Sequence, residues 1–298
     1  MALPLQHLGL VGYGEVGRIF SAGLHGQFQS CAVWDLKFAD PATGAAAQAA
    51  AAAGVQALPS MAALCTQSDF ILSAVTASNT LAVAQAAAPH LRPGTVFLDL
   101  NSASPGTKQQ AALVIEAAGG RYVEAGVMTS VPPYGIRVPM LLGGPLAAEL
   151  AEHLNALGMD AKAVAAEIGV ASAIKMCRSV MIKGLEALVI ESYSTARAYG
   201  VEDYVLPTLA ETFPSIDWEK QGAYFFSRVV QHGQRRAEEM RESARTVQEA
   251  GFTPTMASAI ADKQQAVADQ ARTGAFAHVG KQATWQTYAD ALLAARKP

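Results

Sequence analysis

The sequence predicts an α/β protein in two parts: a doubly wound parallel sheet with helices over residues 1–166, and an all-α domain over residues 167–298. In the first part, short apolar runs typical of buried strands alternate with helical stretches, as in strand–helix–strand units. Beyond about Ile168 only helical periodicity remains. Charge divides likewise, because residues 166–298 hold 30 charged side chains and residues 1–165 hold 17, a pattern typical of charged outer helix faces following a buried sheet.

The first predicted strand leads into a glycine-rich turn. Residues 8–11 form an apolar run, and Gly12, Gly14 and Gly17 follow with the spacing G-x-G-x-x-G. In such a turn the first glycine allows a tight bend, the second lets backbone approach a pyrophosphate, and the third lets helix pack on strand. The helix that starts there offers N–H groups and a positive dipole end to phosphates. The order of parts predicts a Rossmann-type dinucleotide-binding domain; the alternative is a glycine-rich turn in another α/β protein.

The second predicted strand, residues 31–34, ends at Asp35, which bears on the choice of cofactor. Asp35 lies 18 residues after Gly17, where a carboxylate can accept both ribose hydroxyls. Because a carboxylate repels a 2′-phosphate, NAD is predicted over NADP, although Lys37 keeps NADP open. The predicted cofactor-binding residues are Gly12, Tyr13, Gly14, Glu15, Val16, Asp35, Val75, Thr76 and Asn101.

The remaining elements of the first part follow in alternation. Alanine-rich residues 43–53 predict a helix by propensity. Further strands are predicted at residues 69–75, 95–100, 121–124 and 140–142, and further helices at residues 80–88 and 107–118. Ligands of such sheets bind at the carboxyl ends of the strands. We therefore expect Thr76, Asn101, Ser102 and the loop of residues 125–135 to line the pocket.

The second part begins with a long helix. Apolar side chains recur at helical spacing without proline up to Gly200, at Val170, Ile174, Cys177, Met181, Leu185 and Leu188. The pattern predicts a helix of about thirty residues, followed by helices over residues 203–212, 217–250, 255–272 and 282–296. A domain this thin covers a long apolar helix poorly, so we expect a homodimer or higher oligomer joined mainly through residues after 168.

Four stretches carry a resemblance to a known family. They are the glycine turn with Asp35, the run from Asp99 to Pro105 (similar to D-x-S-T-x-x-P), the run Met140–Gly144, and the G-x-x-x-x-x-K run from Gly169 to Lys175. Together they resemble the β-hydroxyacid dehydrogenase superfamily, which includes 6-phosphogluconate and 3-hydroxyisobutyrate dehydrogenases. The resemblance covers roughly residues 5–190, and the rest resembles a shorter C-terminal domain of an uncharacterised branch.

The resemblance implies that Lys175 is the general acid/base. Oxidising an alcohol sends a hydride to the nicotinamide and a proton to a base. A lysine can accept that proton only if burial or a neighbouring cation lowers its pKa. Arg178, one helical turn away, and an oxidised nicotinamide would be such cations. By position alone Lys175 would be a surface lysine near a helix start.

The substrate residues depart from the family pattern. Ser179 stands where the family has an asparagine four residues after the lysine. Met128, Thr129 and Ser130 replace the serine and two glycines of the family's D-x-P-V-S-G-G loop, which aligns from Glu124 onward. A rebuilt pocket is therefore expected, with hydroxyls in place of backbone donors. The predicted substrate-binding residues are Ser102, Met128, Thr129, Ser130, Arg178, Ser179, His232 and Arg236.

A cationic helix face supplies the last two of these residues. Arg228, His232, Arg235 and Arg236 recur at helical spacing, which suits recognition of a substrate carboxylate or phosphate, within one subunit or across a dimer interface. The other interpretation is a solvated face that pairs with neighbouring glutamates, Glu238, Glu239 and Glu242.

The predicted function is an NAD-dependent oxidoreductase that moves a hydride between nicotinamide and a small hydroxy acid or its aldehyde or ketone. The alternatives are an imine reductase-like enzyme, whose relatives usually lack the lysine, and a non-catalytic NAD-binding sensor. The net charge of −3 gives no bulk field for nucleic acid or anionic membrane. Three scattered cysteines fit a reducing, cytoplasmic setting without a metal site, and no apolar run is long enough to span a bilayer.

Overall fold

The computed structural model describes the chain except residues 1–2, 4, 41–43, 53, 281 and 296–298. The chain contacts divide it into two compact units, which we call the sheet unit, Met1–Met176, and the helical unit, Cys177–Pro298. The predicted boundary at residue 166 lies before the start of helix α7 (Val170–Tyr199), whereas the observed division lies within that helix.

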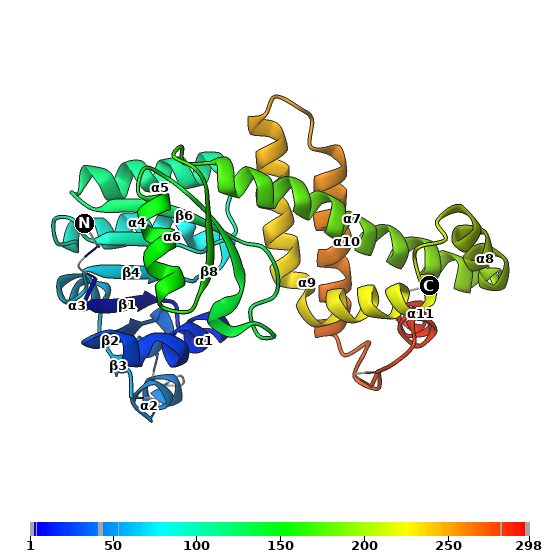
Figure 1. The fold of residues 1–298 in the computed structure, drawn as a ribbon. Helices are drawn as coiled ribbons and strands as arrows, with labels where there is room; N and C mark the ends of the chain where they lie inside the picture. The colour runs from blue at the N-terminus through cyan, green and yellow to red at the C-terminus, as the bar shows by residue number, and fades with distance from the viewer. Residues whose placement is uncertain (1–2, 4, 41–43, 53, 281, 296–298) are drawn as a thin grey trace. The chain divides into compact units, whose positions relative to one another are not determined.

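The sheet unit is built on one mixed sheet with the strand order β3-β2-β1-β4-β5-β6-β7-β8. Its strands are β1 (His7–Val11), β2 (Ser30–Trp34), β3 (Gln56–Ala57), β4 (Phe70–Ser73), β5 (Val96–Asp99), β6 (Arg121–Val127), β7 (Pro139–Gly143) and β8 (Asp160–Ala165) (Figure 1). The α/β class and the all-α remainder are confirmed. The strand order reverses between β1 and β4, and open sheets bind ligands outside the carboxyl ends of strands at such a switch point.

The sheet differs from the prediction at the β6–β7 junction. These two strands are antiparallel, whereas β1, β2, β4, β5 and β6 run parallel to one another. A parallel return needs a crossover of a dozen or more residues, usually a helix. The connection after Val127 carries only a short 3-10 turn (Gly135–Arg137), so the chain returns as an antiparallel neighbour. Because β6 extends to Val127, the first residues of the predicted 125–135 loop belong to a strand.

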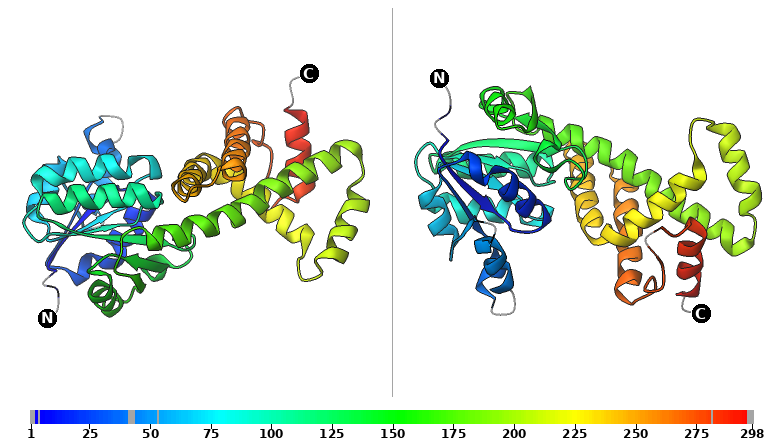
Figure 2. Two further views of the ribbon diagram at one scale, coloured as in Figure 1. Left: turned by 90° about the horizontal axis from the view of Figure 1, so that it is seen from above. Right: turned by 60° about the horizontal axis from the view of Figure 1, so that its bottom comes forward.

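Helices cover both faces of the sheet. Helices α1 (Glu15–Leu24), α2 (Gly44–Ala52) and α6 (Ala147–Ala156) pack with one core cluster, and α3 (Met61–Gln67), α4 (Thr80–Ala87) and α5 (Pro105–Ala117) pack with the other (Figure 2). The strands alternate between the two clusters, as Leu72 and Leu98 belong to the first and Ile71 and Phe97 to the second. The doubly wound arrangement follows from strands buried on both faces.

Sequence patterns missed four elements of this unit. β3 has two residues and α3 has seven, too few for either periodicity to emerge. α6 and β8 were also missed, and three of the six residues of β8 are alanines, which are depleted in strands. Residues 43 and 53 of the predicted 43–53 helix lie outside the described residues, and α2 occupies the part between them.

The helical unit contains the rest of α7 with α8 (Glu202–Thr212), α9 (Trp218–Glu249), α10 (Thr255–Arg272) and α11 (Trp285–Ala294). The predicted ranges agree within a few residues, and residue 296 of the last one is outside the described chain. α9 and α10 run side by side in both figures and share a core with α7 through Ala187, Met240 and Ile260. Within the described residues, no helix is long and apolar enough to cross a membrane.

The apolar positions that identified α7 do not form its buried side. Met181 is 67% exposed and Leu188 is 56% exposed, whereas Ile190 and Tyr193 on the opposite side are buried at 2% and 0%. The periodicity therefore located the helix correctly, and the apolar side chains that revealed it are exposed ones. Small and charged residues interleave with the apolar residues on the buried side, which hid that face from the sequence.

Candidate functional site

The glycine turn has the geometry that its spacing predicts. Gly12 has φ +93°, and a Cβ there would lie 2.5 Å from the Ala74 carbonyl oxygen. A Cβ at Gly17 would lie 2.0 Å from the Gly12 carbonyl oxygen, so α1 can pack on the turn only with glycine at that position. Gly14 is exposed, has open space at its Cβ position, and is the N-cap of α1. These residues fit a dinucleotide, since the backbone N–H groups at the start of α1 can be approached by a pyrophosphate.

Asp35 joins the glycine turn to the end of β2. One carboxylate oxygen accepts a hydrogen bond from the Tyr13 backbone nitrogen at 2.7 Å, and the other accepts from the Lys37 nitrogen at 2.9 Å. Each oxygen has a further lone pair, so the carboxylate can still accept a ribose hydroxyl. The Tyr13 ring is buried, meets Phe38 edge-on, and lies under the Arg18 guanidinium at 5.6 Å. The Tyr13 backbone nitrogen thus holds Asp35 in place, and its ring packs against Phe38 and Arg18.

Asn101 ties together the loops that follow β4 and β5. Its Oδ1 accepts from the Val75 nitrogen at 2.7 Å, and its Nδ2 donates to the Ser73 hydroxyl at 3.0 Å. The side chain is only 3% exposed. Thr76 follows Val75, and its hydroxyl accepts a hydrogen bond from Asn79 Nδ2 at 2.7 Å. The structure thus uses the Asn101 amide to fix the shape of the switch-point loops, a role that the predicted cofactor contact did not include.

Lys175 and Ser102 lie in direct contact. Lys175 Nζ donates a hydrogen bond to Ser102 Oγ at 2.6 Å, although the residues are 73 positions apart. Both side chains are partly buried. Ser102 follows β5, and Lys175 lies in the second turn of α7, within the sheet unit. The structure therefore brings together the predicted acid/base and a predicted substrate-binding hydroxyl.

The loop of Met128, Thr129 and Ser130 begins where β6 ends. The Met128 nitrogen continues the antiparallel ladder by donating to the Pro139 carbonyl at 2.9 Å. Two residues earlier, the Cβ position of Gly126 is 3.5 Å from Lys175 Cβ. Met128 and Ser130 are partly buried and Thr129 is exposed. The loop thus starts from the strand segment that contacts the lysine helix.

The predicted substrate residues of the helical unit have different environments. Arg178 is exposed, His232 is partly buried and Ser179 is 8% exposed. Arg178 and Ser179 continue α7 beyond Lys175, and His232 lies on α9. Substrate binding by these three residues stays a prediction.

Arg236 does not belong to an open cationic face, which corrects the prediction for α9. Its Nε donates to Glu186 Oε2 at 2.9 Å, and its Nη2 contacts Glu186 Oε1. Arg236 and Glu186 are 7% and 1% exposed, and Gln264 Nε2 also donates to Glu186 Oε2, at 3.2 Å. The arginine therefore neutralises a buried carboxylate between α7 and α9. Its helix position faces the core, which the spacing of its charged neighbours did not reveal.

A buried charged cluster behind Ser102 was missed from the sequence. Lys108 Nζ lies 3.0 Å from Asp99 Oδ1 and donates to the Asp99 carbonyl at 2.9 Å, with both side chains at most 1% exposed. The Tyr122 hydroxyl donates to Asp99 Oδ2 at 2.6 Å. Burial raises the pKa of Tyr122 well above its ordinary value, and the Asp99 charge raises it further, so Tyr122 stays a donor. The signal available in the sequence was Asp99, a charged residue at the end of the otherwise apolar strand β5.

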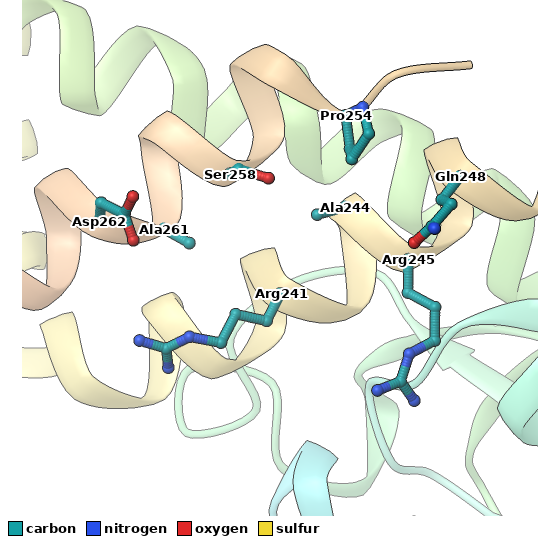
Figure 3. A pocket seen from close by; sticks show the side chains of 8 residues that line it. All are labelled: Arg241, Ala244, Arg245, Gln248, Pro254, Ser258, Ala261 and Asp262. Atoms are coloured by element: carbon teal, nitrogen blue, oxygen red, sulfur yellow. The ribbon is translucent and has the colours of Figure 1, made fainter.

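A cavity of about 310 Å³ lies in the helical unit between α9 and α10 (Figure 3). Its lining comprises Arg241, Ala244, Arg245, Gln248, Pro254, Ser258, Ala261 and Asp262. Arg241 donates to Gln265 Oε1 at 3.2 Å, and Arg245 lies 3.3 Å from Glu242 Oε1. None of the predicted site residues lines this cavity. Among the residues that the structure describes, no three His, Cys, Asp or Glu side chains gather as metal ligands would.

Family models match both units of the chain. The NAD binding domain of 6-phosphogluconate dehydrogenase matches residues 7–135. A domain of unknown function, DUF1932, matches residues 196–267. The first match agrees with the glycine turn and the switch-point loops, and the second lies within the helical unit.

Solved structures cover nearly the whole chain. A conserved hypothetical protein from Sinorhizobium meliloti 1021 is 40% identical, with a TM-score of 0.76 over 96% of this chain and 95% of that one. A conserved protein of unknown function, described as structurally similar to 3-hydroxyacid dehydrogenases, is 30% identical, with a TM-score of 0.67 over 90% and 98%. At 17% identity, 3-hydroxyisobutyrate dehydrogenase of Mycobacterium tuberculosis (TM-score 0.65, 97% and 99% covered) and a reductive aminase from Aspergillus terreus (0.57, 96% and 99%) share the fold.

The fold and the turn define a protein with a dinucleotide-binding, dehydrogenase-like architecture. The chain belongs to the β-hydroxyacid dehydrogenase superfamily, and DUF1932 covers residues 196–267 of its helical part.

Proposed function

We propose that this protein is a nicotinamide-dependent oxidoreductase that interconverts the hydroxyl and carbonyl forms of a small hydroxy acid. The observation that carries the proposal is the 2.6 Å contact between Lys175 Nζ and Ser102 Oγ, beyond the carboxyl end of β5. A nicotinamide, when bound, accepts or supplies the hydride. An amine and a hydroxyl held together at the edge of the sheet where the parallel strands β1, β4 and β5 end are the groups that an alcohol oxidation needs from the protein.

Lys175 has the task of moving the proton. Its amine takes the proton of the substrate hydroxyl during oxidation and returns it during reduction. Ser102 can hold the amine in place before substrate arrives, and its hydroxyl can both donate to and accept from a substrate oxygen. Ser179, one turn further along α7, is the second hydroxyl that we assign to holding the substrate.

The test is a panel of 3-hydroxyisobutyrate, L-serine and related hydroxy acids and carbonyls, followed at the nicotinamide absorbance band. On the substrate that gives turnover, Lys175→Ala should lower kcat by at least about 10², the lower scale of general acid–base catalysis, and leave cofactor affinity unchanged. Lys175→Arg should not restore kcat, because a guanidinium does not give up its proton. Lys162→Ala, at an exposed lysine on β8, is the matched control. A near-normal kcat in Lys175→Ala would refute the lysine mechanism.

For the cofactor, we propose NAD in preference to NADP. The proposal is supported by the Asp35 carboxylate, fixed at the end of β2 where it can accept from the ribose hydroxyls and would repel a 2′-phosphate. The reductive aminase that shares the fold was solved with NADPH, so both cofactors belong in the assay. Equal kcat/KM for the two cofactors would contradict the preference.

Two other functions predict different results on the same panel. An imine reductase-like enzyme, suggested by the shared fold of the reductive aminase, would reduce cyclic imines and would not need Lys175. A non-catalytic sensor would bind the cofactor without turnover on any compound, and its affinity would be independent of Lys175. Lys175 in contact with Ser102 favours alcohol chemistry over both.

The assembly that we propose is a homodimer or higher oligomer through α7. Within the helical unit, Met181, Ile182, Leu185 and Leu188 are all at least 36% exposed and lie on one side of the helix. A contiguous apolar stripe of this kind is typical of a protein interface. Light scattering at micromolar concentration should give at least twice the 31.1 kDa chain mass, and Met181→Glu should shift it toward the monomer. A monomeric mass for the unmutated protein would refute the assembly.

A further inference from the structure

A buried carboxylate from the sheet binds the first turn of the lysine helix. Glu124, on β6, is 0% exposed. Its Oε1 accepts from the backbone nitrogens of Gly169 at 2.7 Å and Ala171 at 3.0 Å, and its Oε2 accepts from the Ser172 nitrogen at 3.3 Å. The first N–H groups of a helix have no partner within the helix, and a negative charge there is favourable to the helix dipole. Glu124 therefore supplies from 45 positions away the partners that a local N-cap residue ordinarily supplies.

Glycines shape the space around this carboxylate. A Cβ at Gly143, on the neighbouring strand β7, would lie 2.5 Å from Glu124 Oε1. A Cβ at Gly126 would lie 3.0 Å from the Ala171 carbonyl oxygen, so glycine there lets α7 approach β6 closely. Gly169 has φ +111°, a conformation that favours glycine and turns its N–H toward Glu124. Three glycines thus accommodate one carboxylate and the start of one helix.

A second buried carboxylate, that of Asp99, lies beside Glu124 in the sheet and holds the loop that carries Ser102. Asp99 on β5 is the register partner of Glu124 on β6. Asp99 Oδ1 accepts from the Asn101 nitrogen at 2.8 Å, which fixes the backbone just before Ser102. Adjacent positions of two paired strands therefore hold the loop of Ser102 and the helix of Lys175, the two sides of the 2.6 Å contact.

We propose that Glu124 is the positioning residue for Lys175. It sets the axial position and rotation of the first turns of α7, so that Lys175 Nζ reaches Ser102 Oγ. The proposal rests on the proposed function for its catalytic meaning, since Lys175 is the acid/base only there. Glu124 itself touches neither substrate nor cofactor and acts through the helix backbone.

The experiment measures how far Lys175 is held in its contact, without needing a substrate. The folded protein is trace-labelled with acetic anhydride, and mass spectrometry compares acetylation of Lys175 with that of the exposed Lys162. Glu124→Gln removes the charge and one acceptor. It should raise the Lys175 to Lys162 ratio about fivefold, the change expected from losing one hydrogen bond to the amine. Glu124→Asp keeps the charge but withdraws the oxygens by one methylene, so it should raise the ratio as well, and it replaces Glu124→Gln if that variant does not fold.

The matched control is Asp69→Asn. Asp69 Oδ1 also accepts two backbone N–H groups, from Gln6 and His7 at 2.9 Å each, but at the opposite end of the sheet. Loss of this carboxylate should leave the Lys175 ratio unchanged. On the substrate found by the panel, Glu124→Gln should also lower kcat by about tenfold to hundredfold with cofactor KM unchanged, because a small misplacement of a reacting group has that cost.

The outcomes separate this proposal from the proposed function. An unchanged labelling ratio in a folded Glu124 variant would overturn the positioning role and leave the lysine mechanism standing. A near-normal kcat in Lys175→Ala would refute the mechanism, while the labelling ratio would still report on Glu124. If neither Glu124 variant folds, the residue serves the stability of the fold, and the positioning role is overturned.

Discussion

The two units use buried charge in different ways. In the sheet unit, Asp99 and Glu124 bind backbone groups of the loop before Ser102 and the helix of Lys175. In the helical unit, Glu186 and Arg236 bind each other's side chains and link α7 to α9. A buried charge of the first kind specifies where the backbone lies, whereas a pair of the second kind holds together helices that apolar packing could also hold. Buried pairs of the second kind are often replaceable by hydrophobic residues without loss of stability.

The largest expected effect is on the stability of the protein, through the buried ion pair of Lys108 and Asp99 in the sheet unit. Lys108→Met should lower the free energy of unfolding by about 3 to 5 kcal/mol, because Asp99 would be left buried and without its cation. Urea denaturation measures the change, and Lys162→Met at an exposed lysine should change it little. A loss of unfolding free energy below about 1 kcal/mol would mean that water or another group reaches Asp99. The buried charges of the two units would then differ less than we propose.

The helical unit should tolerate replacement of its pair. Arg236→Leu alone should destabilise by about 3 kcal/mol, because Glu186 would be buried without its partner. The double variant Glu186→Leu, Arg236→Leu should come within about 1.5 kcal/mol of the original, the remainder being the lost bond to Gln264. Its kcat/KM should be preserved. A tenfold loss of kcat/KM in the double variant at normal stability would instead support the prediction that Arg236 binds substrate.

A smaller effect is expected at the cofactor turn. Asp35→Ala removes a carboxylate that can accept ribose hydroxyls, so Kd for NAD should rise about tenfold, the order of one charged hydrogen bond. The ratio of NAD to NADP affinity should narrow at the same time. Fluorescence titration of both cofactors measures the change. Because Asp35 also binds the Tyr13 and Lys37 nitrogens, circular dichroism should first establish that the variant folds.

The smallest expected effect is on the reactivity of two cysteine thiols buried in the core of the sheet unit. Burial raises the pKa of the Cys31 and Cys65 thiols to about 12 from an ordinary 9.0. Since the thiolate is the reactive form, both should resist iodoacetamide at about pH 8 and react only after unfolding in urea. Their reactivity should rise with pH only as it approaches 12. Alkylation of either cysteine in the folded protein at about pH 8 would show that this core opens more readily than its packing indicates.

The elements that could be predicted from the sequence are those whose signals are local. The glycine turn, Asp35 at the end of the second strand and the helices from Val170 onward were all predicted within a few residues of their observed positions. The spacing G-x-G-x-x-G needs only neighbouring residues to specify a turn, and the 3.6-residue period needs only one helix. β3 and α3 were not predicted because their two and seven residues are too few to show a periodicity.

Which side chains meet depends on the tertiary structure. The antiparallel return of β7, the inward direction of Arg236, and the contact of Lys175 with a hydroxyl 73 positions away depend on strand order and helix rotation. Family motifs named Lys175 and Ser102 separately, but neither motif contained Glu124 as an anchor. A carboxylate that binds a helix 45 positions later leaves no periodic trace in the sequence, because its partners are backbone N–H groups that every residue except proline possesses.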